Sequence, residues 1–202
     1  MGIISEDVRK QIAEMFKELT NNVTIIYHEN EKAQLNLQIK NLLKEVVDIN
    51  DKIKMEIVKD DSKLTPYFDL KGVNNGVIRF MGIPSGHEFT TLIESIKLAS
   101  TGNHMLSDES VAFLKSIDKP VDMKVFITTT CPHCPSAVFL AHRFACVSDE
   151  ITASMVEAME FQELSMKFNI TAVPNTIIND SEGYVGAYPE NMAIDALKKK
   201  LQ

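Results

Sequence analysis

Two kinds of hydrophobic pattern follow one another along the chain, and both occur in each half. Apolar residues at spacings of three and four predict amphipathic helices, whereas short apolar or alternating runs between turn residues predict strands. An Asn-Gly turn at 75–76 separates two such runs and predicts a hairpin. For the first half we expect helices over residues 5–20, 35–46 and 87–99, and strands over residues 23–27, 53–58, 67–70 and 77–81.

The second half repeats this order after a short connecting helix. We expect helices near residues 107–117, 134–145, 161–168 and 191–202, and strands over residues 124–128, 151–158, 176–178 and 184–187, with a turn at 181–183. Each half thus has a β-α-β unit, a strand led by proline, a hairpin partner and a closing helix. This order predicts an α/β protein with a mixed sheet flanked by helices. We expect two domains, residues 1–103 and 104–202.

Composition excludes several classes of protein. The 202 residues are 45% hydrophobic and 24% charged, as in ordinary globular proteins. Lys and Arg number 21 against 28 Asp and Glu, a net charge of −7 that disfavours nucleic-acid binding. No apolar run reaches the ~20 residues of a transmembrane helix, and the chain begins with charged residues instead of a signal peptide. We therefore expect a cytoplasmic protein without membrane contact.

Two of the three cysteines, Cys131 and Cys134, lie at the junction of a predicted strand and a predicted helix. Residues i and i+3 on a helix lie about 5–6 Å apart, which matches the Cα separation of a disulfide. The helix N-terminus should lower the pKa of the Cys131 thiol below the free value of about 8.5. We expect Cys131 to be the nucleophile and Cys134 the resolving thiol.

The neighbouring residues support this interpretation. Pro132 suits a helix start, and His133 can add positive charge near the thiolate. A zinc site is the alternative, but the chain has no second Cys-x-x-Cys and no closely spaced histidine pair to complete one. Cys146 is too far along the helix to bridge either cysteine, and we expect it to pack in the core. No Gly-x-Gly-x-x-Gly occurs, so we expect no bound cofactor and electrons from another protein or a small thiol.

A proline at position 174 adds to the evidence from the cysteine motif. Cys-x-x-Cys after a strand, Val173-Pro174 opening a later strand, and a closing hairpin and helix resemble the thioredoxin fold. The resemblance implies that Pro174 is cis and faces the dithiol. It also implies that the backbone at 172–173 accepts an extended substrate segment by strand addition.

Further segments resemble the tandem-thioredoxin protein disulfide oxidoreductases of archaea and thermophilic bacteria, and also the N-terminal domain of the alkyl hydroperoxide reductase flavoprotein. These segments are residues 80–89, 131–135, 155–161, 172–175 and 186–190. The resemblance implies two tandem thioredoxin-like folds. It implies a thioredoxin-reductase-like flavoprotein as electron donor, and a peroxiredoxin or other disulfide-containing proteins as acceptors.

One departure from these families bears on mechanism. Where the oxidoreductases have a first Cys-x-x-Cys, this chain has Ala33 and Asn36, and Thr65-Pro66 stands at the first cis-proline. We expect the first half to keep the fold without redox chemistry. No buried carboxylate is expected among residues 125–130, so the proton-transfer group is not assigned. Three interpretations remain: a thiol–disulfide oxidoreductase, a metal- or iron–sulfur-binding module using the same cysteines, and a docking adaptor.

Overall fold

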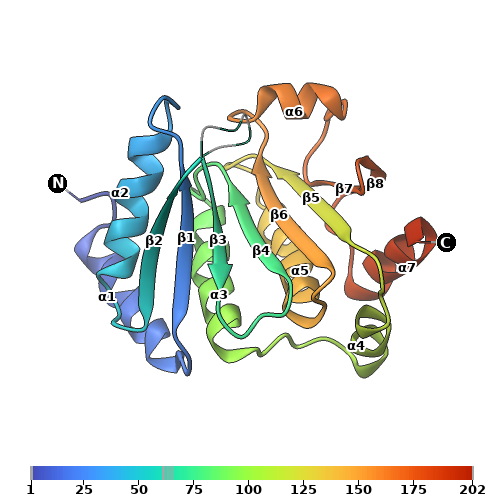
Figure 1. Ribbon diagram of the computed structural model, residues 1–202, viewed down its shortest axis with the longest axis horizontal. Coiled ribbons are helices and arrows are strands. Elements are labelled where there is room, and N and C mark those ends of the chain that lie inside the picture. Colours follow the sequence, from blue (N-terminus) through green and yellow to red (C-terminus); the bar gives the residue numbers. More distant parts are fainter. Residues whose placement is uncertain (1, 61, 63, 65, 202) are drawn as a thin grey trace.

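The computed structural model describes residues 2–60, 62, 64 and 66–201 (Figure 1). The helices are α1 (Glu6–Met15), α2 (Asn36–Val47), α3 (Glu88–Thr101), α4 (Asp108–Lys115), α5 (Cys134–Val147), α6 (Gln162–Lys167) and α7 (Glu190–Leu201), and a 3₁₀ turn, Phe16–Glu18, extends α1. The strands are β1 (Val23–Glu29), β2 (Ile53–Lys59), β3 (Tyr67–Lys71), β4 (Val77–Met81), β5 (Val121–Ile127), β6 (Ile151–Glu157), β7 (Asn175–Ile178) and β8 (Ser181–Val185).

The described strands form one mixed sheet in the order β2-β1-β3-β4-β6-β5-β7-β8. In each half the first strand pairs in parallel with the second and antiparallel with the third, which pairs antiparallel with the fourth. The same four-strand arrangement therefore occurs twice. Strands β4 and β6 pair in parallel and join the halves, a continuity that the hydrophobic pattern does not predict.

Local signals explain where several helices begin and end. Ser5 and Ser107 are the N-caps of α1 and α4, and their hydroxyls accept hydrogen bonds from backbone N–H groups in the first turn. Gly102 ends α3 in the left-handed conformation, with a φ of 69°. These residues set helix boundaries close to those that the sequence predicts.

The two faces of the sheet differ in burial. Helices α2, α3 and α5 contribute to one continuous core against alternate strand residues such as Ile25, Phe80 and Val125. Figure 1 shows α3 and α5 side by side behind the central strands. On the opposite face, His28, Tyr67 and related side chains are only partly buried, and the short helix α6 covers one end of it.

The turn expected at 181–183 is wrong, because these residues begin β8. The turn lies instead at Asn179 and Asp180, whose φ angles are 49° and 55°. Asn and Asp tolerate this left-handed conformation better than most residues. Gly183 serves another purpose, since a Cβ there would lie 2.5 Å from a carbonyl oxygen of β7.

Among the described residues, no helix is both long and apolar enough to cross a bilayer.

Candidate redox site at the start of helix α5

The two motif cysteines lie where β5 passes into α5, as the sequence predicts. The backbone N–H of Cys131 donates to the carbonyl of Thr128 at 3.0 Å, which tightens the connecting loop. Cys134 is the first residue of α5 and is fully buried, whereas Cys131 is partly exposed. The two form a disulfide with their Cα atoms 5.5 Å apart. Of the two sulfur atoms, that of Cys131 is thus the more accessible to a second protein.

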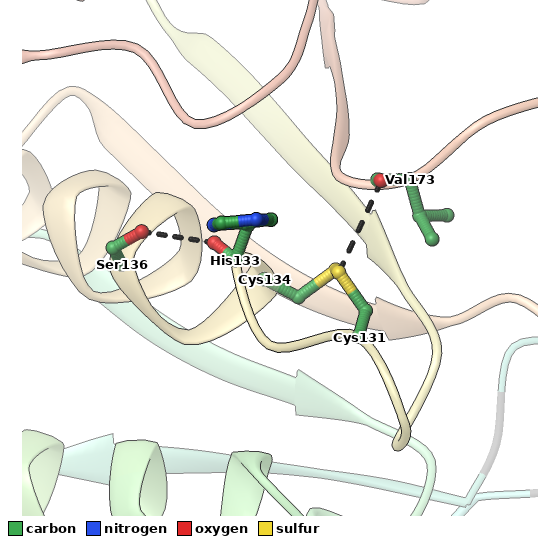
Figure 2. The surroundings of a disulfide bond; sticks show 5 residues. All are labelled: Cys131, His133, Cys134, Ser136 and Val173. Carbon is green, nitrogen blue, oxygen red and sulfur yellow. Dashed lines mark hydrogen bonds between the residues drawn. A yellow bond between two sulfur atoms is a disulfide. The ribbon is translucent and has the colours of Figure 1, made fainter.

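A distant loop reaches the accessible sulfur. The Cys131 Sγ lies 3.9 Å from the carbonyl oxygen of Val173 (Figure 2). The Val173–Pro174 peptide bond is cis, as the resemblance implies, and Pro174 is buried immediately before β7. The fold therefore brings together Cys131, Cys134, Val173 and Pro174 from two segments that are far apart in the sequence.

The residues between the cysteines face solvent. Pro132 and His133 are exposed, and the His133 side chain makes no capping hydrogen bond to α5. The Ser136 hydroxyl donates to the His133 carbonyl at 2.9 Å and closes the first turn of the helix (Figure 2). Uncapped backbone N–H groups at a helix N-terminus favour a thiolate nearby.

A loop from the first half of the chain packs directly on the strand–helix junction. The His87 backbone N–H donates to the Thr129 carbonyl at 3.2 Å. Gly86 approaches the same carbonyl so closely that a Cβ would lie 2.4 Å from its oxygen, and its φ is 58°. Both requirements favour glycine at this position. The first half thus forms part of the surroundings of the redox loop.

Glu88 follows this loop, and the sequence interpretation treats it only as part of the start of the helix over residues 87–99. Its side chain is fully buried, and neither carboxyl oxygen has a hydrogen-bond partner within the described part of the chain. Burial raises its pKa to about 7, against a smaller opposite effect of the Thr91 side chain. The sequence does contain a signal, because Glu88 shares a helical stripe with Leu92 and Ile96 and so lies on the apolar face of α3.

Two further carboxylates lie near the end of β6. Glu157 stands opposite Ile127 at the end of β5, is 4% exposed, and accepts the Glu160 backbone N–H at 2.7 Å. Glu160 accepts the Ile83 backbone N–H at 2.8 Å, and burial raises its pKa to about 7. Burial also raises the pKa of Glu157. Glu160 thus holds the loop 82–87 against the second half through the Ile83 backbone N–H, and Glu157 binds the backbone of Glu160.

The first half has a counterpart of the redox motif without sulfur. Helix α2 begins at Asn36, as α5 begins at Cys134. The Tyr27 hydroxyl donates to Asn36 Oδ1 at 2.6 Å, and the Asn36 amide donates to Glu29 at 3.2 Å. Lys40 lies 2.6 Å from Glu29, and hydrogen bonds from Lys40 and Asn36 lower the pKa of Glu29. A buried polar network therefore occupies the position of the dithiol.

Two remaining sequence predictions concern Pro66 and the third cysteine. Pro66 is buried immediately before β3, at the position that Pro174 holds before β7, whereas Thr65 lies outside the described residues. Cys146 is buried and unpaired, and burial raises its pKa to about 11. This agrees with a packing role.

The geometry also bears on the metal alternative. Among residues 2–60, 62, 64 and 66–201, no three or more His, Cys, Asp and Glu side chains are grouped as metal ligands.

The fold and the disulfide at a helix start define a thioredoxin-like protein. In agreement, the family described as the thioredoxin domain matches residues 121–199. The chain is 28% identical over 184 residues to the F subunit of alkyl hydroperoxide reductase from Staphylococcus aureus, covering 89% of this chain and 35% of that protein. It thus spans about a third of the length of the curated relatives that it matches.

Two solved structures are similar to the chain over nearly its whole length. The F subunit of alkylhydroperoxide reductase from Enterococcus faecalis has a TM-score of 0.87 and 25% identity, covering 96% of this chain and 99% of that one. A protein disulfide oxidoreductase of Aeropyrum pernix has a TM-score of 0.88 and 26% identity, covering 97% and 93%. These relatives and the Cys131–Cys134 disulfide support a redox role in thiol–disulfide exchange.

Proposed function

We propose that the protein is a thiol–disulfide oxidoreductase that passes two electrons through Cys131 and Cys134. The donor is a thioredoxin-reductase-like flavoprotein or a small thiol, and the acceptors are a peroxiredoxin or other proteins with disulfides. The observation that carries this proposal is the disulfide at the start of α5 with its outer sulfur beside the Val173 carbonyl. A cytoplasmic location stays a prediction.

The proposed reaction begins with the reduced pair. The Cys131 thiolate attacks one sulfur of the substrate disulfide, forms a mixed disulfide and releases one substrate thiolate, which takes up a proton. The Val173 backbone holds the substrate segment extended beside the sulfur. The N-terminus of α5 stabilises Cys131 as an attacking and a leaving thiolate.

Resolution follows on the buried side. The Cys134 thiolate attacks the Cys131 sulfur, releases the second substrate thiol and closes the Cys131–Cys134 disulfide. Two electrons have then moved from the dithiol to the substrate, and the donor restores them. We propose Glu88 as the group that accepts the Cys134 proton, because it is fully buried directly after His87, whose backbone N–H donates to the Thr129 carbonyl of the redox loop, and burial raises its pKa to about 7.

The test is to trap the mixed disulfide. We expect Cys134→Ser to accumulate a covalent adduct with a disulfide-bearing protein, because the resolving thiol is gone. Peptide mapping should place the adduct on Cys131. Cys146→Ser is the control and should leave turnover unchanged, since that thiol is buried and has a raised pKa. An adduct on another residue, or none, would contradict the assignment.

The direction of electron flow is tested by the equilibrium potential of the pair. A value near about −270 mV would indicate a thioredoxin-like reductase, and one near about −120 to −180 mV an oxidase or isomerase. A titration without a two-electron couple would favour the metal- or iron–sulfur-binding alternative. Metal analysis of protein purified under reducing conditions would then decide.

For the architecture we propose two thioredoxin-like domains, residues 1–103 and 104–202, fused through the shared sheet. The repeated strand order supports this division. We propose that the first domain serves as scaffold and docking surface, since Ala33 and Asn36 cannot perform thiol chemistry.

A further inference from the structure

A groove of about 860 Å³ lies at the first-half counterpart of the redox site. One wall is formed by the loop that contains Ala33 and Leu35, together with Leu64 and Pro66. The opposite wall is the segment that leads into and forms α6 in the second half. This volume lies within the range of ligand pockets and can hold a few side chains.

The position of the groove follows from the repeat. Ala33 precedes α2 by the same three residues that separate Cys131 from the start of α5, and Pro66 precedes β3 as Pro174 precedes β7. In the second half, the corresponding positions hold Cys131 and Pro174, and the Cys131 sulfur lies beside the Val173 carbonyl. The groove is therefore the site at which the first half would receive an extended polypeptide, without sulfur.

The groove and the redox site are linked through a shared buried cluster. Phe161 and Leu164 line the groove and pack on the same buried cluster as Val173. The carbonyl of Val173 lies 3.9 Å from the Cys131 sulfur. Both sites also lie at the same end of the sheet, beyond the carboxyl ends of β1, β5 and β6 (Figure 1). The groove and the disulfide therefore lie on the side of the molecule to which β1, β5 and β6 lead.

The exposed side chains indicate what the groove receives. Leu64 is 46% exposed and Met159 is 65% exposed, although both are large and apolar. Flexible methionine side chains adapt to partners of varied shape. The charged residues that line the groove are Glu160, Glu163 and Lys167, so both signs of charge occur and the lining does not select a strongly charged ligand.

We propose that the groove binds an extended apolar segment of the disulfide-bearing protein and holds it while its disulfide reaches Cys131. This inference rests on the proposed function and names the way in which substrates are selected. The first half is then a binding site that lowers KM, and the second half performs the chemistry.

The experiment uses two synthetic peptides with the same internal disulfide, one with a Leu- and Met-containing extension and one with a Ser- and Asn-containing extension. We expect the apolar peptide to have a lower KM, and Leu64→Glu/Met159→Glu to raise that KM about tenfold with kcat unchanged. Turnover of the polar peptide and of a small aromatic disulfide should not change. Met192→Glu on α7, also an exposed methionine at 46%, is the matched control.

A direct binding measurement separates this inference from the proposed function. A fluorescent apolar peptide without cysteine should bind the wild type and not the double variant, whether or not the protein reduces disulfides. Equal KM values for both peptides, or equal binding by wild type and variant, would overturn the proposal. A dimer in sedimentation that the double variant abolishes would also overturn it, because a second copy would then be the occupant.

Discussion

Residues 33–36 and 131–134 hold corresponding positions in the two halves, and they differ in almost everything except backbone framework. In the second half a disulfide joins the loop to α5. In the first half Asn36 begins α2 and accepts a hydrogen bond from Tyr27 at 2.6 Å. The fold therefore does not need a dithiol at this position, because a buried network of hydrogen bonds can take its place. Function resides in the side chains placed on a repeated framework.

The comparison extends to one carboxylate beside each site. Glu29 is paired with Lys40, and this contact lowers its pKa. Glu88 is fully buried, and burial raises its pKa to about 7 more strongly than the Thr91 side chain lowers it. The charged form of Glu29 is stabilised, whereas the charged form of Glu88 is destabilised. Only the second arrangement suits proton exchange near neutral pH.

The largest expected effect is the loss of turnover when Cys131 is replaced, compared with a replacement of Ala33 at the corresponding position. Cys131→Ser should reduce turnover of a model disulfide by about a thousandfold or more, as loss of a nucleophile does in other enzymes. The corresponding change Ala33→Ser should leave turnover unchanged, because that position has no sulfur partner. Steady-state reduction of a small aromatic disulfide measures both. Substantial activity of the Cys131 variant would contradict the assignment of Cys131 as the nucleophile.

The next effect concerns proton transfer. Glu88→Gln should slow the resolving step at pH 7 by about a hundredfold. The rate of that step in the wild type should rise as the pH passes through about 7, where Glu88 ionises. In the variant this rise should disappear. Rapid-mixing kinetics of mixed-disulfide decay between pH 5 and 9 would provide the profile, and an unchanged profile would assign the proton to another group.

Stability should depend on pH in opposite directions for the two carboxylates. Between pH 4.5 and about 7, the folded protein keeps the Glu88 proton that the unfolded chain releases. The contribution of this proton to the free energy of unfolding is therefore full below pH 4.5 and is lost as the pH rises through about 7. Glu88→Gln should therefore gain stability relative to wild type at pH 8, on the order of 3 kcal/mol. Glu29→Gln should lose stability at pH 7 and little at pH 3, because the pKa of Glu29 is lowered. Urea denaturation at each pH tests both.

The smallest effect concerns the polar network of the first half. Asn36→Ala removes one of the two acceptors of the Tyr27 hydroxyl, which keeps the Asn36 backbone carbonyl at 3.0 Å, and it removes one donor to Glu29. Leaving buried polar groups unsatisfied should lower the free energy of unfolding by about 1–3 kcal/mol. Turnover of a small disulfide should be unchanged. A variant as stable as wild type would show that water replaces the amide.

The sequence predicts the helices, the strands and the Cys131–Cys134 pair well, because periodicity and spacing are local properties. It places the turn of the last hairpin wrongly, since Gly183 at a close approach to β7 resembles a turn glycine. Whether Gly183 faces a neighbouring strand depends on pairing that no local pattern contains.

Burial of polar residues is the other property that the sequence does not predict. Glu88 and Asn36 resemble ordinary surface residues at helix starts, yet both are buried. Their environments arise from other segments: Tyr27 contacts Asn36, and the backbone N–H of His87, next to Glu88, contacts Thr129. Such contacts can only be identified once the fold has brought the elements together.

The parallel pairing of β4 with β6, which joins Val77–Met81 to the second half, makes the two halves inseparable. If either half were removed, the other would expose an open strand edge with unpaired N–H and C=O groups, which invites aggregation. The protein should consequently unfold in one cooperative transition. The redox loop then cannot move relative to the first half as an independent arm, because the dithiol is held on a framework that both halves share.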